Sequence, residues 1–203
     1  GYSYPDEEPE NRLVWGRYYH RYPLDLALGN AEKTRPTLVI LPGWLSVGYY
    51  IYRRIAVCFV EQGIDCLVLA LPYHLERTPS GSFSGERLFT PDLAKSLRGL
   101  QQSLLECLQA ITWLQSQGIE SIGTLGISLG GLINGLITTR EPGLKYSILW
   151  VPATCLEKPM RHSTLCQPVK ERIFAAGVNL RELQSVSQLA EPAAYPPAID
   201  RER

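Results

Sequence analysis

Apolar runs alternate with amphipathic segments along this chain. Strands that are covered on both faces are apolar nearly throughout, and such runs occur at residues 36–41, 64–71, 119–125 and 144–151. Leucine and isoleucine recur at helical spacing over 92–118, and shorter helices are expected at 49–62 and 131–140. This alternation predicts an α/β fold with a mostly parallel sheet and helices on both faces.

The remaining segments lack this regular pattern. Leu13 to Leu28 has Leu24, Leu26 and Leu28 on one face, which predicts one or two antiparallel edge strands. Residues 72–91 are rich in proline, glycine and serine, and a loop of this length inside a compact domain indicates a function.

We therefore divide the chain into four parts. We expect a flexible lead-in at 1–12, the core at 13–152, a lid-like helical segment at 153–192 and an extended tail at 193–203. A length of 203 residues with 45% hydrophobic residues suits one globular domain.

Charge and composition exclude several classes of partner. Lysine plus arginine equals aspartate plus glutamate at 20 each, so nothing basic indicates nucleic acid. No apolar run approaches the roughly 18 residues of a membrane span. The five cysteines include no Cys-x-x-Cys pair, which favours a reducing, cytoplasmic environment.

The segment Gly-Ile-Ser-Leu-Gly at residues 126–130 has the pattern of a nucleophile elbow, because a predicted strand precedes it and a predicted helix follows. The elbow exposes the serine hydroxyl on a sharp turn, and the flanking glycines remove side chains that would collide there. The alternative is a small-residue turn between strand and helix. The strand and helix context favours the elbow, with Ser128 as the nucleophile.

From about residue 13 onward the chain resembles the α/β-hydrolase superfamily. Residues 41–44 (Leu-Pro-Gly-Trp) look like that family's oxyanion loop. The resemblance implies that the backbone N–H groups of Trp44 and Leu129 stabilise the oxyanion, with Gly43 allowing close approach. A tight turn after a strand is the alternative for Gly43.

Residues 71–86 look like the α/β-hydrolase domain-containing 18-like branch of that superfamily. His74 follows a strand at the edge where ligands bind in open α/β sheets, so it is a candidate substrate-binding residue. The alternative is a loop histidine bonded to its own backbone. Tyr49 and its aromatic neighbours, together with Trp150, indicate either an apolar acyl pocket or helix packing.

The chain departs from the family's order of serine, acid and histidine. After Ser128 it has one aspartate, Asp200, and one histidine, His162, in the reverse order. Two further strands of the family are also missing. Together with an acidic start that lacks methionine and resembles no signal peptide, this predicts a C-terminally incomplete fold and part of a longer or processed chain.

Two functions follow from these observations. The first is a serine hydrolase that, in the full-length form, cleaves a small-molecule ester, thioester or amide through an acyl-enzyme on Ser128. The second is a truncated or non-catalytic scaffold that binds a ligand or partner. The sheet edge after residue 151 would be unpaired, which predicts self-association. The three histidines have no metal-ligand spacing, so no cofactor or metal is expected.

Overall fold

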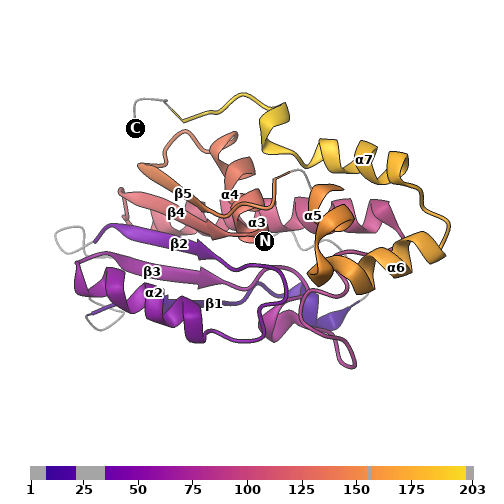
Figure 1. Ribbon diagram of the computed structural model, residues 1–203. Helices are drawn as coiled ribbons and strands as arrows, with labels where there is room; N and C mark the ends of the chain where they lie inside the picture. Colours follow the sequence, from indigo (N-terminus) through magenta and orange to yellow (C-terminus); the bar gives the residue numbers. More distant parts are fainter. Residues whose placement is uncertain (1–7, 22–34, 155–156, 200–203) are drawn as a thin grey trace.

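The computed structural model describes residues 8–21, 35–154 and 157–199, and within them it forms one five-stranded sheet (Figure 1). The strand order is β1-β3-β2-β4-β5, with β1 antiparallel to β3 and the other neighbours parallel. The strands are β1 (Gly16–Tyr19), β2 (Thr37–Leu41), β3 (Asp65–Leu69), β4 (Ile122–Ile127) and β5 (Tyr146–Trp150). The predicted mostly parallel sheet is therefore confirmed.

Helices connect the parallel strands and extend beyond the sheet. The α-helices are α2 (Tyr50–Glu61), α3 (Leu93–Ser116), α4 (Leu129–Thr138), α5 (Glu157–His162), α6 (Gln167–Ala175) and α7 (Leu180–Leu189). Short 3₁₀ helices are η1 (Pro9–Arg12), η2 (Leu75–Arg77), η3 (Thr164–Cys166) and η4 (Pro192–Ala194). Among the described residues, no helix is long and apolar enough to cross a membrane.

The two faces of the sheet pack into two separate cores. Leu38 and Ile40 of β2 belong to the core that includes residues of α2. Val39 and Leu41, whose side chains point the opposite way, belong to the core that includes α3 and α4. Successive strand residues face opposite sides, so a strand buried on both faces must be apolar at every position. The predicted helices on both faces are thus confirmed (Figure 1).

Local residues explain where helix α3 begins and ends. Its N-cap is Asp92, whose side chain accepts a hydrogen bond from the Lys95 N–H. Gly118, with φ of +84°, follows its end, because glycine adopts this left-handed conformation without a side-chain clash. The helix packs against α4 on one side and α7 on another.

Strand β5 differs from the sequence expectation, which made residues 144–151 a buried strand. Trp150 is 52% exposed and Val151 is 73% exposed. The physical reason is position: within the described residues β5 pairs only with β4 and forms an edge of the sheet. An apolar run alone does not distinguish an edge strand from a central one.

Segments without regular patterning were harder to interpret from sequence. β1 supplies the antiparallel edge strand expected between Leu13 and Leu28, while Leu24, Leu26 and Leu28 lie outside the described residues. Residues 72–91 form turns and the short η2, as expected of an irregular loop.

The irregular loop is nevertheless well buried in part. Arg77 is fully buried, and its guanidinium donates to both carboxylate oxygens of Glu106 on α3, at 2.5 and 2.9 Å. A charge-assisted bidentate pair of this kind fixes the loop to the helix.

Candidate active site

Ser128 occupies the turn between β4 and α4 in a strained conformation, with φ of 54° and ψ of −111°. A non-glycine residue in this region of backbone space is uncommon, and such strain is typical of functional turns. The flanking glycines make the turn sterically feasible. A Cβ on Gly126 would overlap the carbonyl of Gly130, and a Cβ on Gly130 would overlap the carbonyl of Leu41.

Backbone hydrogen bonds hold the turn in place. The Ser128 N–H donates to the Trp150 carbonyl at 3.0 Å, and the Ser128 carbonyl accepts from Leu132 and Ala153 at 3.0 Å each. Leu129 is the first residue of α4, so its N–H has no partner within the helix. The positive end of the helix dipole therefore lies beside the Ser128 hydroxyl.

The loop after β2 lies against this turn. A Cβ on Gly43 would be 3.5 Å from the Cβ of Ser128, which is an ordinary van der Waals distance. The close approach expected at Gly43 is present, but the space would also accept a small side chain.

The hydroxyl of Tyr52 holds that loop, a role that no pattern in the sequence predicted. It accepts a hydrogen bond from the Gly43 N–H at 3.0 Å and lies 2.5 Å from the Ser46 hydroxyl. Ser46 in turn donates to the Gly43 carbonyl at 2.7 Å. The signal in the sequence was the aromatic cluster at 49–52, from which Tyr49 rather than Tyr52 was named as the candidate.

The Trp44 side chain is fixed by the irregular loop. Its indole N–H donates to the Gly85 carbonyl at 3.0 Å, and its ring meets Phe89 edge-on with 5.7 Å between ring centroids. Gly85 is itself bonded through its N–H to the Tyr73 carbonyl at 2.7 Å. The loop at 72–91 therefore positions the residue whose backbone was expected to stabilise an oxyanion.

His74 is fully buried behind Trp44 rather than exposed to a ligand. Its Nδ1 lies 2.7 Å from the Pro72 carbonyl, which requires a proton on Nδ1, and its Nε2 is an unpartnered acceptor. Burial lowers the pKa of His74 to about 4, so the ring is neutral at pH 7. This geometry matches the alternative of a loop histidine bonded to its own backbone.

A cavity of about 160 Å³ is lined in part by Ser128. Three of the residues named from the sequence, Ser128, Leu129 and Trp44, line it together. The rest of its wall comes from the irregular loop, the residue three positions after β5 and the segment around α5 and η3, namely Phe89, Ala153, Met160, Ser163, Leu165 and Cys166. Residues of the segment expected as a lid therefore form part of this wall.

Two aromatic residues named from the sequence lie elsewhere. The Tyr49 hydroxyl donates to Glu76 at 2.8 Å, and its ring lies under the Arg17 guanidinium at 3.9 Å. Burial and the bond to Glu76 raise the pKa of Tyr49. Neither Tyr49 nor the exposed Trp150 lines the Ser128 cavity.

The structure assigns no base to Ser128 among the residues it describes. No described side chain makes a hydrogen bond to the Ser128 hydroxyl, and His162 is exposed at the end of α5. Asp200 lies outside the described residues. Burial raises the pKa of the Cys166 thiol, which keeps it protonated. In the described ranges, no three His, Cys, Asp or Glu side chains gather as metal ligands would.

Solved structures with this fold include several hydrolases. An acetyl xylan esterase from Paenibacillus sp. R4 aligns with a TM-score of 0.61 and 15% identity, covering 89% of this chain and 60% of the esterase. The Pyrococcus horikoshii acylaminoacyl peptidase aligns with a TM-score of 0.55 and 15% identity, covering 89% of this chain and 27% of the peptidase. Est1E from Butyrivibrio proteoclasticus, with ferulic acid bound, aligns with a TM-score of 0.53 and 17% identity, covering 73% of this chain and 52% of Est1E. The chain therefore has a hydrolase-like scaffold.

Sequence relatives are longer than this chain. Two proteins of Mycobacterium tuberculosis, Uncharacterized protein MT2702 of strain CDC 1551 / Oshkosh and Uncharacterized protein Rv2627c of strain H37Rv, are each 31% identical over 168 residues. The match covers 80% of this chain and 34% of each relative, so the chain spans about a third of their length. The family model described as alpha/beta hydrolase domain containing 18 matches residues 26–162, which include both the elbow and the loop at Trp44. This chain belongs to the alpha/beta hydrolase domain containing 18 family.

Proposed function

We propose that this protein supplies the nucleophile and oxyanion site of a serine hydrolase that acts through an acyl-enzyme on Ser128. The observation that carries the proposal is the strained turn of Ser128 at the start of α4, in one cavity with Trp44 and Leu129. Strain of this kind persists only where the surrounding structure enforces it, and it aims the hydroxyl at the cavity.

In this mechanism the Ser128 oxygen attacks the carbonyl carbon of the substrate while a general base takes its proton. The carbonyl oxygen becomes an oxyanion, which accepts hydrogen bonds from the N–H groups of Leu129 and Trp44. Each such donor stabilises the transition state by about 3 kcal/mol. Collapse of the intermediate expels the leaving group, and water then releases the acyl group.

The base and its orienting acid belong, in this proposal, to residues outside the described ranges. Within those ranges His74 is unsuited to the role, because it is fully buried and its Nδ1 proton is committed to the Pro72 carbonyl. The curated relatives are about three times as long as the aligned segment, which leaves ample chain for both groups.

The proposed substrate is a small ester, thioester or amide with a compact acyl group. A cavity of about 160 Å³ walled by Phe89, Met160 and Leu165 suits an apolar acyl moiety better than a charged one. Esterases among the solved structures of this fold support the same substrate class.

A fluorophosphonate probe tests the proposal, since it reacts covalently with activated serines. We expect labelling of a form extended beyond Arg203 to the length of the relatives, and complete loss of labelling in Ser128→Ala. Ser185→Ala is the matched control, because Ser185 is an exposed serine on α7 that does not line the Ser128 cavity, and this change should leave labelling unchanged. The proposal would be refuted if the extended chain stayed unlabelled, or if its Ser128→Ala variant were still labelled.

A second candidate is a scaffold that binds ligands without turnover. It is favoured by one observation: no described side chain hydrogen-bonds the Ser128 hydroxyl. A serine without its base is a weak nucleophile. The 203-residue form then stays unlabelled, whereas prompt labelling of that form at Ser128 would exclude this candidate.

A further inference from the structure

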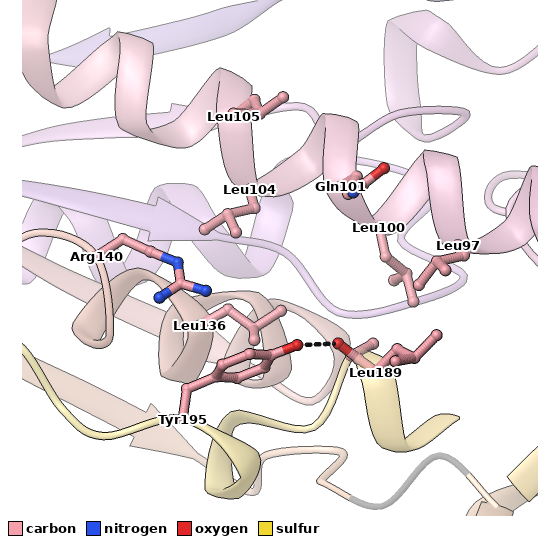
Figure 2. Close-up of a pocket in the computed structure, with 10 residues that line it drawn as sticks. Leu97, Leu100, Gln101, Leu104, Leu105, Leu136, Arg140, Leu189 and Tyr195 are labelled. Carbon is pink, nitrogen blue, oxygen red and sulfur yellow. Dashed lines mark hydrogen bonds between the residues drawn. The ribbon is translucent and has the colours of Figure 1, made fainter. Parts of the chain in front are cut away.

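A cavity of about 380 Å³ lies between α3, α4 and the segment that leads from α7 to Tyr195 (Figure 2). Its walls are mostly leucines, including Leu97, Leu100, Leu104 and Leu105 of α3, Leu136 of α4 and Leu189 of α7. No residue that lines it also lines the Ser128 cavity. It is therefore a site separate from the proposed hydrolase chemistry.

The α3 wall is a continuous apolar stripe. Leu97, Leu100 and Leu104 recur at spacings of three and four residues, so their side chains follow one face of the helix. At about 1.5 Å per residue, the stripe extends for about 10 Å. Figure 2 shows these leucines spread along the helix above Leu136 and Leu189.

Arg140 is the one cationic side chain among the cavity-lining residues, and Figure 2 shows its guanidinium directed into the cavity. Its centre lies 4.9 Å above the ring of Tyr195. Its Nη1 donates only a long bond, 3.5 Å, to the Thr139 carbonyl. Arg140 is exposed, no carboxylate of the described residues lies within ion-pair distance of its guanidinium, and most of its N–H donors bond to no described protein group.

The Tyr195 side chain is fixed beneath Arg140. Its hydroxyl donates to the Leu189 carbonyl at 2.8 Å, which joins the segment after α7 to the end of that helix. The tail is further anchored where the Ala198 N–H donates to the Thr138 carbonyl at 2.8 Å. Stacking on a fixed ring restricts the guanidinium, so less entropy is lost when it binds an anion.

We propose that this cavity binds a monocarboxylate with an unbranched apolar chain. The carboxylate accepts hydrogen bonds from the Arg140 guanidinium, and the chain lies along Leu104, Leu100 and Leu97. Charge complementarity selects this occupant, since an apolar groove with one unpaired arginine matches a ligand with one anionic end. An alkyl cation or a purely polar anion satisfies only one of the two features.

Calorimetric titration of the 203-residue protein with decanoate, below its micellar concentration, tests the proposal. We expect one saturable site with a negative heat-capacity change, the mark of buried apolar surface. Decyltrimethylammonium, with the same chain and the opposite charge, and acetate, with the charge alone, should each bind at least about tenfold more weakly. Ser128→Ala should bind decanoate as tightly as the parent, so the result is independent of the proposed hydrolase activity.

Variants locate the site. Arg140→Gln should raise the dissociation constant about tenfold or more, because a charge-assisted bidentate pair is lost. Arg53→Gln, an exposed arginine on α2, changes net charge equally and should leave binding unchanged. Leu189→Asp places a negative charge in the cavity wall at a side chain that is 58% exposed, and it should abolish binding.

Three results would overturn the proposal. The first is no saturable binding of decanoate by a folded protein. The second is equal binding of decanoate and the alkyl cation, which would indicate an unselective apolar groove suited to another protein or to lipid. The third is an equal loss of affinity in Arg140→Gln and Arg53→Gln, which would indicate attraction by overall charge alone.

Discussion

Acidification should destabilise this protein through His74. The ring is fully buried beside Trp44 and Gly85, and its pKa is lowered from 6.5 to about 4, chiefly by burial and further by the charge of Arg77. Between pH 6.5 and pH 4 the unfolded chain therefore binds a proton at this side chain that the folded protein does not bind. Linkage then requires that the free energy of unfolding falls as the pH falls through this window, and below pH 4 the loss is complete.

The size of the effect follows from the pKa difference. A difference of about 2.5 units, at about 1.4 kcal/mol per unit, makes the loss about 3 kcal/mol across the whole window. About 2 kcal/mol of it falls between pH 6.5 and pH 5, where the folded state is easier to study. A loss of this size is a large fraction of the 5–15 kcal/mol that stabilises an ordinary domain.

Urea unfolding of the parent and His74→Gln at pH values from 7.5 to 5 isolates this contribution. The parent should be more stable at pH 7.5, and the difference between the two proteins should shrink by about 2 kcal/mol at pH 5. Ser84→Ala is the control, because it removes a buried, non-titrating side chain of the same loop. A stability difference between parent and His74→Gln that does not vary with pH would refute the reasoning.

Three further changes probe the elbow, the irregular loop and the sheet edge. Gly126→Ala should prevent stable folding, as a Cβ there would overlap the Gly130 carbonyl, and thermal unfolding would measure the loss. Glu106→Gln should cost about 3–5 kcal/mol in urea unfolding, because it leaves the guanidinium of the fully buried Arg77 without its counter-charge. Ile148→Lys should reduce concentration-dependent association in sedimentation velocity, since lysine on an edge strand opposes edge-to-edge pairing.

Each of these changes has a control in the same chain. Gly48→Ala meets nothing within 4 Å and should be tolerated, so equal damage by both glycine variants would contradict the steric account. Replacing Arg77 and Glu106 together by methionine should recover much of the stability, and a double variant as unstable as Glu106→Gln would argue against the charge explanation. Ile51→Lys, exposed on α2, should not alter association, and a parent that is monomeric at all concentrations would exclude pairing at this edge.

The elements were predictable because their information is local. The apolar run at 37–41 is buried on both faces, and the leucine spacing at 93–116 gives one long helix, since each pattern repeats with the period of the element itself. The elbow was predictable for the same reason: a serine between two glycines, at a strand-to-helix junction, is a signal contained within a few residues.

The burial of a strand at the edge of the sheet could not be predicted from a local pattern. Residues 144–151 have the same apolar character as the central strands, yet β5 is partly exposed. The exposure of β5 depends on which strands lie beside it, and the local sequence pattern does not specify the neighbouring strands.

The surroundings of the elbow were also decided by distant contacts. Tyr49 and Tyr52 belong to one aromatic cluster. The Tyr52 hydroxyl hydrogen-bonds to the Gly43 N–H, whereas the Tyr49 hydroxyl hydrogen-bonds to Glu76. His74 stands in a polar loop and is nevertheless fully buried, because other parts of the fold enclose it.

Local patterns were enough to predict the order of strands and helices along the chain and the turn at Ser128, because each depends on spacing within a short segment. The loop at Trp44 was expected from the resemblance to the α/β-hydrolase superfamily. Three features depend on how the elements pack: Tyr52 and Gly85 hold the Trp44 loop, β5 lies at an edge of the sheet formed by the described residues, and Arg140 faces a leucine-lined cavity. The bond from the Trp44 indole to the Gly85 carbonyl joins residues 41 positions apart, and the bond from the Gly43 N–H to the Tyr52 hydroxyl joins a loop to a helix. Such contacts form only when the helices, strands and loops pack together, so the periodicity of the sequence does not predict them.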